Sequence, residues 1–170
     1  MRASSLIAWA LILSACSGLV GAQQRSSYDN PGEVRGAAAR LPALKQLVVH
    51  EVLDYCAALA PARADTMKAS IRKWHERNRA LVRAGDKVRA QIEAEVRGSV
   101  EASAVAAMFA SEPALNQQVA RVLLDKIAAL PDEDSKRAMC LNISVATDNG
   151  QFDIASDDPD VVALLRSNLD

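Results

Sequence analysis

The sequence predicts an all-α protein: a compact bundle of five or six helices with one disulfide, placed after a cleaved signal and a flexible tether. From residue 41 onward, apolar residues recur at the period of a helix with one buried face. Pro and Gly residues interrupt this pattern at intervals typical of helix ends. The chain has 170 residues, of which 50% are apolar, so it is long enough for one domain with an ordinary core.

Residues 1–22 have the composition of an export signal. Arg2 precedes an apolar run at residues 6–13, which is too short to cross a bilayer as a helix. Two cleavage sites are open. The tripeptide before residue 23 suits an ordinary signal peptidase that cuts after Ala22. The alternative cut falls before Cys16.

The sequence Leu-Ser-Ala-Cys at residues 13–16 resembles the lipobox of bacterial lipoproteins. The resemblance covers only the first 16 residues, and it implies a diacylglycerol on the Cys16 thiol and an acylated new amino terminus. Several acyl chains anchor a protein stably. We favour this cleavage, and Ser17 in place of Asp indicates the outer membrane by analogy. We therefore expect a periplasmic, outer-membrane-anchored lipoprotein without a transmembrane span; a soluble periplasmic or secreted protein is the alternative.

Residues 23–40 have no apolar period and contain Ser, Asn, Pro and Gly. We expect a flexible linker here and a helical domain over residues 41–170. A flexible segment of about 25 residues leading from Cys16 would give a root-mean-square reach of roughly 25–30 Å. The domain would then act a short distance above the membrane.

The apolar pattern in the first part of the domain predicts two or three helices. One helix carries Pro42 in its first turn and ends before Pro61. A second apolar stripe covers residues 67–96. It fits one helix that reaches about Arg97, or two helices with a break near residues 84–86.

Beyond Gly98, many small side chains over residues 100–110 allow close approach of helices. Ser111 is expected to cap the next helix, which ends at Pro131. Its apolar stripe, expected to face the core, consists of Leu115, Val119, Val122, Leu123, Ile127 and Leu130.

Residues 140–154 fit two structures. Alternating apolar residues around Asn149 and Gly150 indicate a hairpin. The same residues also fit a helix that starts near Asp132 or Asp134 and ends at Gly150 in a left-handed conformation. We favour the helix, because a lone two-stranded hairpin is marginally stable. A short terminal helix follows residues 157–159.

Cys56 and Cys140 remain once Cys16 is lipidated or removed. A cysteine pair in an exported chain is usually a structural disulfide. A redox pair is the rival hypothesis, but the chain has no Cys-x-x-Cys motif. We therefore expect a disulfide that joins the first helix to the segment around residue 140.

His50 and Asp54 share one helix face in a pattern similar to the HExxH zinc motif, with Asp in place of the second His. A catalytic zinc needs three protein ligands, and His75 is the only other His in the chain. We expect solvated polar residues here, and neither a metal nor a cofactor.

The segment at residues 74–78 offers a candidate partner-binding site. Trp74 and Asn78 lie on one helix face, and Trp is enriched at interface hot spots. The favoured interpretation is a core Trp beside an Asn that bonds neighbouring backbone. The candidate partner-binding residues are Trp74, Arg77, Asn78, Arg79 and Arg83.

The formal net charge of −1 lacks the basic excess of nucleic-acid-binding proteins. Charge is nevertheless unevenly distributed. Residues 61–97 hold ten Lys and Arg against five Asp and Glu, whereas residues 131–170 hold three against nine. We expect these segments to complement each other within the fold, although such a difference can also steer a charged partner.

No phosphate loop, serine nucleophile elbow, zinc-finger spacing or internal repeat occurs in the chain. We therefore expect a non-catalytic interaction protein of the cell envelope that binds a protein partner, as an inhibitor, a toxin-immunity protein or an assembly accessory. The alternative is a periplasmic enzyme that uses scattered carboxylates with His50 or His75, acting on peptidoglycan. A pocket lined by those residues would favour the enzyme, and a flat convex patch around one charged helix would favour the binding protein.

Overall fold

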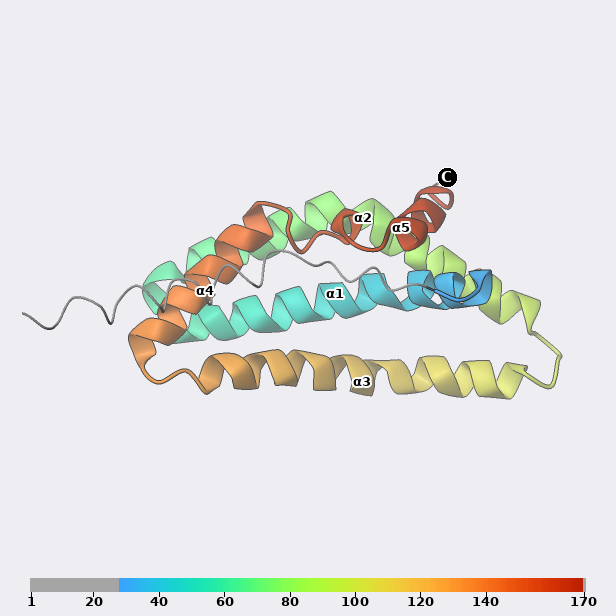
Figure 1. The fold of residues 1–170 in the computed structure, drawn as a ribbon, viewed down its shortest axis with the longest axis horizontal. Helices are drawn as coiled ribbons and strands as arrows, with labels where there is room; N and C mark the ends of the chain where they lie inside the picture. Colours follow the sequence, from blue (N-terminus) through green and yellow to red (C-terminus); the bar gives the residue numbers. More distant parts are fainter. Residues whose placement is uncertain (1–27, 170) are drawn as a thin grey trace, which may run out of the picture.

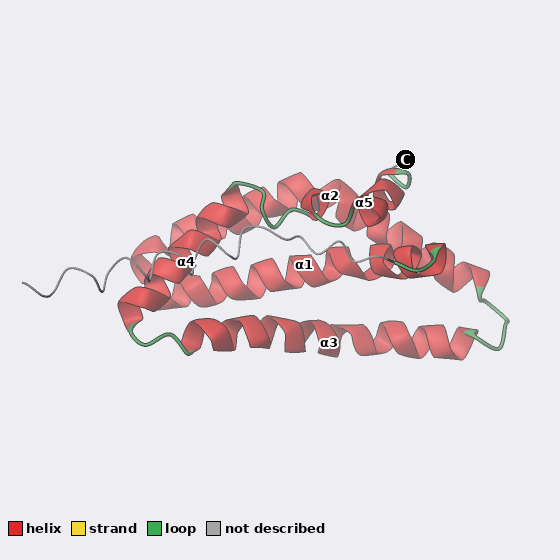
Figure 2. Cartoon of the chain, in the orientation of Figure 1, coloured by secondary structure: helices red, strands yellow, loops and turns green. Residues whose placement is uncertain are grey.

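The predicted fold class is confirmed. The computed structural model describes residues 28–169, which contain five α-helices, two short 3-10 turns and no strand (Figures 1 and 2). The helices are α1 (Pro31–Leu59), α2 (Ala64–Glu95), α3 (Ala102–Ala128), α4 (Glu133–Asp148) and α5 (Pro159–Arg166). Cys16, the rest of the predicted signal and the start of the predicted linker lie outside the described residues.

Helix α1 begins at Pro31, so the expectation of a flexible linker up to residue 40 is wrong from Pro31 onward. The cause is a capping arrangement at residues 29–33. The Asn30 side chain accepts a hydrogen bond from the Glu33 backbone N–H, and the Glu33 carboxylate accepts one from the Asp29 N–H. These bonds satisfy backbone donors that a helix start leaves free.

Pro42 lies inside α1 instead of in its first turn. Its ring packs against α2 at Gly85, where an added Cβ would lie 2.8 Å from Pro42 Cγ and 3.1 Å from the Ala38 carbonyl oxygen. Helix α2 passes through Gly85 without a break, which settles the open alternative for this stretch as one helix. Gly85 therefore serves the close approach of two helices and does not end one.

Helix α3 is continuous across Ser111, so the predicted cap at that residue is wrong. The Ser111 hydroxyl donates to the Met108 carbonyl within the helix, and Pro113 lies in the helix interior. The connection before α3 contains Gly98 with a φ of 84°. Positive φ is favourable for Gly, which explains the change of chain direction here.

The helical alternative for residues 140–154 is confirmed. The Asp132 side chain caps α4 by accepting from the Ser135 N–H, and Gly150 follows its end with a φ of 75°. Asp158 caps α5 in the same manner, by accepting from the Asp160 N–H.

The helices α1 and α2 form the centre of the domain, and α3 lies alongside α1 (Figure 1). Helices α4 and α5 pack on α1 and α2. The largest fully buried side chains include Trp74, Leu53, Met67, Ile154 and Leu165. The predicted Cys56–Cys140 disulfide joins α1 to α4, with its Cα atoms 5.3 Å apart. No helix within residues 28–169 is long and apolar enough to cross a bilayer.

Candidate binding groove and apolar helix face

Trp74 and Asn78, the central candidates for partner binding, are buried in the core. The Trp74 indole Nε1 donates to the Phe152 carbonyl oxygen at 2.9 Å. The Asn78 amide donates to the Trp74 carbonyl oxygen and to the Asp153 carboxylate, and it accepts from the Ile154 N–H at 2.8 Å. These two side chains therefore hold the segment after α4 against α2, as the core interpretation predicted.

The remaining candidates do not complete a binding surface around Trp74. Arg77 makes two hydrogen bonds to the Asp153 carboxylate and one to the Thr147 carbonyl oxygen. Burial alone would raise the pKa of Asp153, but the hydrogen bonds from Arg77 and Asn78 hold the pKa of this carboxyl below its usual value. Arg79 and Arg83 are exposed on α2.

Charges of the basic segment pair with charges of the acidic segment within the fold, as expected. On α2, Lys73 pairs with Asp148 at 2.8 Å, next to the pair of Arg77 with Asp153. From α1, Lys45 lies 2.7 Å from the Asp157 carboxylate. Burial raises the pKa of Asp157 despite this neighbour. The basic segment thus meets the acidic one across the α2 surface.

The two histidines do not converge on a catalytic or metal site. His50 Nδ1 lies 3.2 Å from the Asp54 carboxylate on the exposed face of α1. The His75 ring packs edge-on against Trp74, and burial lowers the pKa of His75. Within the part of the chain that the structure describes, no three His, Cys, Asp or Glu side chains cluster closely enough to hold a metal ion.

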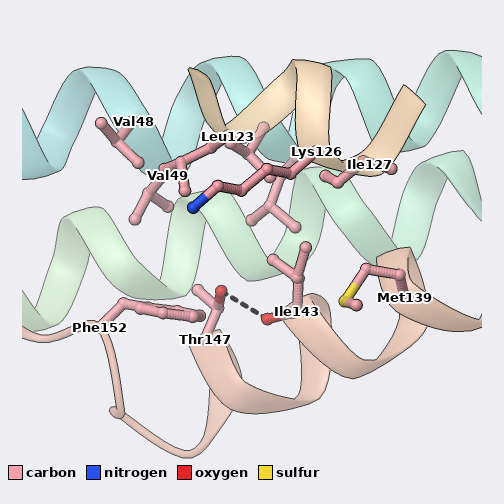
Figure 3. Close-up of a pocket in the computed structure, with 11 residues that line it drawn as sticks. Val48, Val49, Leu123, Lys126, Ile127, Met139, Ile143, Thr147 and Phe152 are labelled. Carbon is pink, nitrogen blue, oxygen red and sulfur yellow. Dashed lines mark hydrogen bonds between the residues drawn. The ribbon is translucent and has the colours of Figure 1, made fainter. Parts of the chain in front are cut away.

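An apolar groove of about 270 Å³ lies between α1, α3 and α4 (Figure 3). We call the α1 side of the groove its floor and the α3 and α4 sides its walls, and Phe152 lies at one end (Figure 3). The Thr147 hydroxyl donates to the Ile143 carbonyl oxygen of its own helix and so needs no partner in the groove. The lining residues are Val48, Val49, Val52, Leu53, Leu123, Lys126, Ile127, Met139, Ile143, Thr147 and Phe152.

Both walls of the groove are fixed by contacts outside it. The Cys56–Cys140 disulfide holds α4 to α1, one turn beyond the floor residue Leu53 and directly after the wall residue Met139. This bond sets the distance between floor and wall at that end.

On the α3 side, the buried Glu112 carboxylate accepts a hydrogen bond from Arg89 of α2 and lies 3.5 Å from Arg40 Nε of α1. The Arg89 guanidinium also lies over the Phe109 ring, 4.6 Å from its centroid. Removing Arg89 would leave the buried Glu112 carboxylate without its hydrogen-bond partner, which is costly, so these contacts anchor α3. The positions of both groove walls are therefore fixed by contacts within the folded domain.

A second apolar feature, the α3 face, lies on the exposed side of this helix. It consists of Met108, Leu115, Val119 and Val122, whose exposed fractions are 37%, 46%, 43% and 54%. Their spacings of seven, four and three residues place them on one side of a helix. Leu123, which is 36% exposed, also lines the groove.

The spacing of apolar residues predicts that Leu115, Val119 and Val122 face the core, and this prediction is wrong. Helix α3 instead buries Phe109, Glu112, Ala120 and Ile127. The spacing of the apolar residues identifies the helix but not which side is covered, because α3 carries apolar residues on two adjacent sides. In the sequence, only the width of the apolar stripe of α3 indicates that one apolar side could remain uncovered.

Comparison with known proteins finds no matching family model, no matching curated protein and no matching solved structure. The fold and the site define an all-α domain with one disulfide, an apolar groove and an exposed apolar helix face.

Proposed function

We propose that this chain is a non-catalytic binding protein of the cell envelope, and that the α3 face is its docking surface for a protein partner. The observation that carries this proposal is a line of four exposed apolar side chains along a helix of 27 residues. Contiguous apolar surface that remains exposed on a folded domain marks interaction sites.

The shape of the α3 face indicates what kind of partner fits. A helix of this length spans about 40 Å, and its exposed apolar residues recur at helical spacing. Such a stripe pairs with the apolar side of an amphipathic helix. We therefore expect the partner to present a helix whose apolar residues pack between Leu115, Val119 and Val122.

The enzymatic alternative gains no support from the arrangement of its candidate residues. His50 pairs with Asp54 on the helix surface, whereas His75 packs against Trp74. Neither His lines the apolar groove. The side chains of the α3 face are aliphatic or thioether groups, which bind by packing and carry no acid–base chemistry.

A charge placed on the α3 face is expected to abolish partner binding. The full chain with Val119→Lys should fail to capture a partner that the unchanged chain captures from envelope extract, because an ammonium group cannot be buried in an apolar interface without a large cost. Val119 is partly exposed, so helix content and melting temperature should stay close to those of the unchanged chain.

The matched control is Arg83→Glu, a charge change at an exposed residue of α2. This variant should capture the partner normally. Loss of capture with Arg83→Glu together with normal capture by Val119→Lys would refute the α3 face as the docking surface.

We further propose that the chain is a lipoprotein held at the periplasmic side of the outer membrane through Cys16. The support is the lipobox-like sequence at residues 13–16. The lipidated protein should partition into the detergent phase, and Cys16→Ala should move it to the aqueous phase, because the anchoring acyl chains are lost. Equal partitioning of both forms would restore cleavage after Ala22 and a soluble exported protein.

A further inference from the structure

We propose that the groove between α1, α3 and α4 binds the acyl chain of a single-chain anionic amphiphile, with its charged head beside Lys126. This site is separate from the protein-docking α3 face. The two are neighbours because Leu123 of α3 lines the groove, but one can fail without the other.

The lining of the groove selects an aliphatic ligand. Val52 and Leu53 are buried on its floor, and Ile127 is buried in its α3 wall. Leu123, Met139 and Phe152 are partly exposed at its edges, with exposed fractions of 36–40%. Apolar cavities of this kind hold water poorly and take up apolar molecules. An alkyl chain satisfies such a lining without any hydrogen bond.

The volume of the groove sets the length of the chain. The space measures about 270 Å³. A methylene group is similar in size to a water molecule, whose share of the liquid is about 30 Å³. The groove therefore accommodates roughly eight to ten methylene groups, which is one medium-length acyl chain. A second chain would have no room.

Lys126 indicates that the head of the ligand is negatively charged. It is the only charged residue among the described residues that line the groove, and its side chain extends toward Val49 (Figure 3). Among residues 28–169, none of the ion pairs involves the Lys126 ammonium group. A carboxylate or phosphate at the end of the acyl chain would pair with this exposed ammonium group.

The binding test uses dodecanoate with the full chain, below the concentration at which dodecanoate forms micelles. Dodecanoate should displace an apolar fluorescent dye from the protein, and dodecyl phosphate should do the same. Dodecyltrimethylammonium has the same chain with a positive head, so it should bind about fivefold more weakly, the upper end of the effect expected for one exposed charge pair. Equal binding of the anionic and cationic amphiphiles would overturn the role of Lys126.

Two variants locate the ligand. Lys126→Ala should remove the preference for the anionic head, whereas Arg121→Ala, at an exposed residue of the same helix outside the groove lining, should keep it. Val48→Phe should fill the groove and abolish dodecanoate binding. Melting temperature and helix content show whether that variant folds, and Ile143→Phe fills the groove from the opposite wall. Full dodecanoate binding by either folded groove-filling variant would overturn the proposal.

The test of the acyl-chain site can be distinguished from the test of the protein-docking α3 face. Val119→Lys should lose the protein partner and still bind dodecanoate, whereas Val48→Phe should lose dodecanoate and still capture the partner. Loss of both activities in both variants would show one shared site and would refute the separate acyl site.

Discussion

Reduction of the Cys56–Cys140 disulfide is expected to lower the free energy of unfolding by about 2–5 kcal/mol while most of the helix content persists. The bond joins residues 84 positions apart in the sequence. Closing a loop of that length restricts the unfolded chain by about 4–5 kcal/mol in the chain-entropy model. The helices persist because α1 and α2 still bury a shared apolar core around Trp74 and Met67.

Denaturant titration measures this effect directly. Trp74 is the only Trp within residues 28–169, and it is fully buried, so its emission should be blue-shifted in the folded protein and red-shifted after unfolding. The unfolding midpoint should fall after reduction and in the double variant Cys56→Ala with Cys140→Ala. Reductant should leave the midpoint of the double variant unchanged, which is the control. Two free thiols in natively purified protein would reject the disulfide.

Asn78→Ala is expected to lower the free energy of unfolding by about 2–3 kcal/mol, the cost of leaving buried polar groups without partners. The Asn78 amide accepts from the Ile154 N–H and donates to the Asp153 carboxylate, and both are lost with Ala. The Ile154 N–H donates to Asn78 Oδ1 inside the core, so Ala at position 78 removes this buried acceptor.

The same denaturant titration checks this prediction, and Arg79→Ala is its matched control. Arg79 follows Asn78 in α2 but is exposed, so its removal should change the free energy of unfolding by less than about 0.5 kcal/mol. Hydrogen exchange should also become faster at the Ile154 amide in Asn78→Ala. Unchanged stability would mean that Asn78 does not hold the segment after α4.

The sequence predicted the features that depend on short-range chemistry. Pro61 and Gly150 ended helices as expected, because one lacks a backbone donor and the other adopts positive φ. The disulfide followed from two cysteines in a chain for which the sequence predicts an export signal. The burial of Trp74 and the hydrogen bonds of Asn78 to nearby backbone followed from their shared position on the apolar stripe of α2.

The predictions that were wrong concern residues whose place in a helix depends on contacts with another helix. Pro42 was placed in a first helical turn, because the sequence does not show that Gly85 of another helix packs against its ring. Pro113 lies inside α3, where the neighbouring Glu112 is paired with Arg89 of α2. Both prolines occupy helix interiors that long-range packing supports.

The sequence predicts the individual apolar residues of the candidate site but not the groove that they form together. Residues such as Val52, Leu123 and Ile143 each match a core pattern, and nothing in their spacing shows that three helices leave a groove between them. The α3 face was missed for a related reason. Helix α3 packs mainly on α1, so one of its two apolar sides remains uncovered.

In-cell photocrosslinking tests the central claim, that the α3 face binds a protein partner, most directly. A photoreactive amino acid replaces Val119 in one version of the full chain and Arg83 in another, so that the two exposed surfaces are compared in the intact envelope. We predict a covalent adduct with a different protein from position 119 and none from position 83. An adduct only from position 83, or an adduct from position 119 that contains two copies of this chain, would contradict the account.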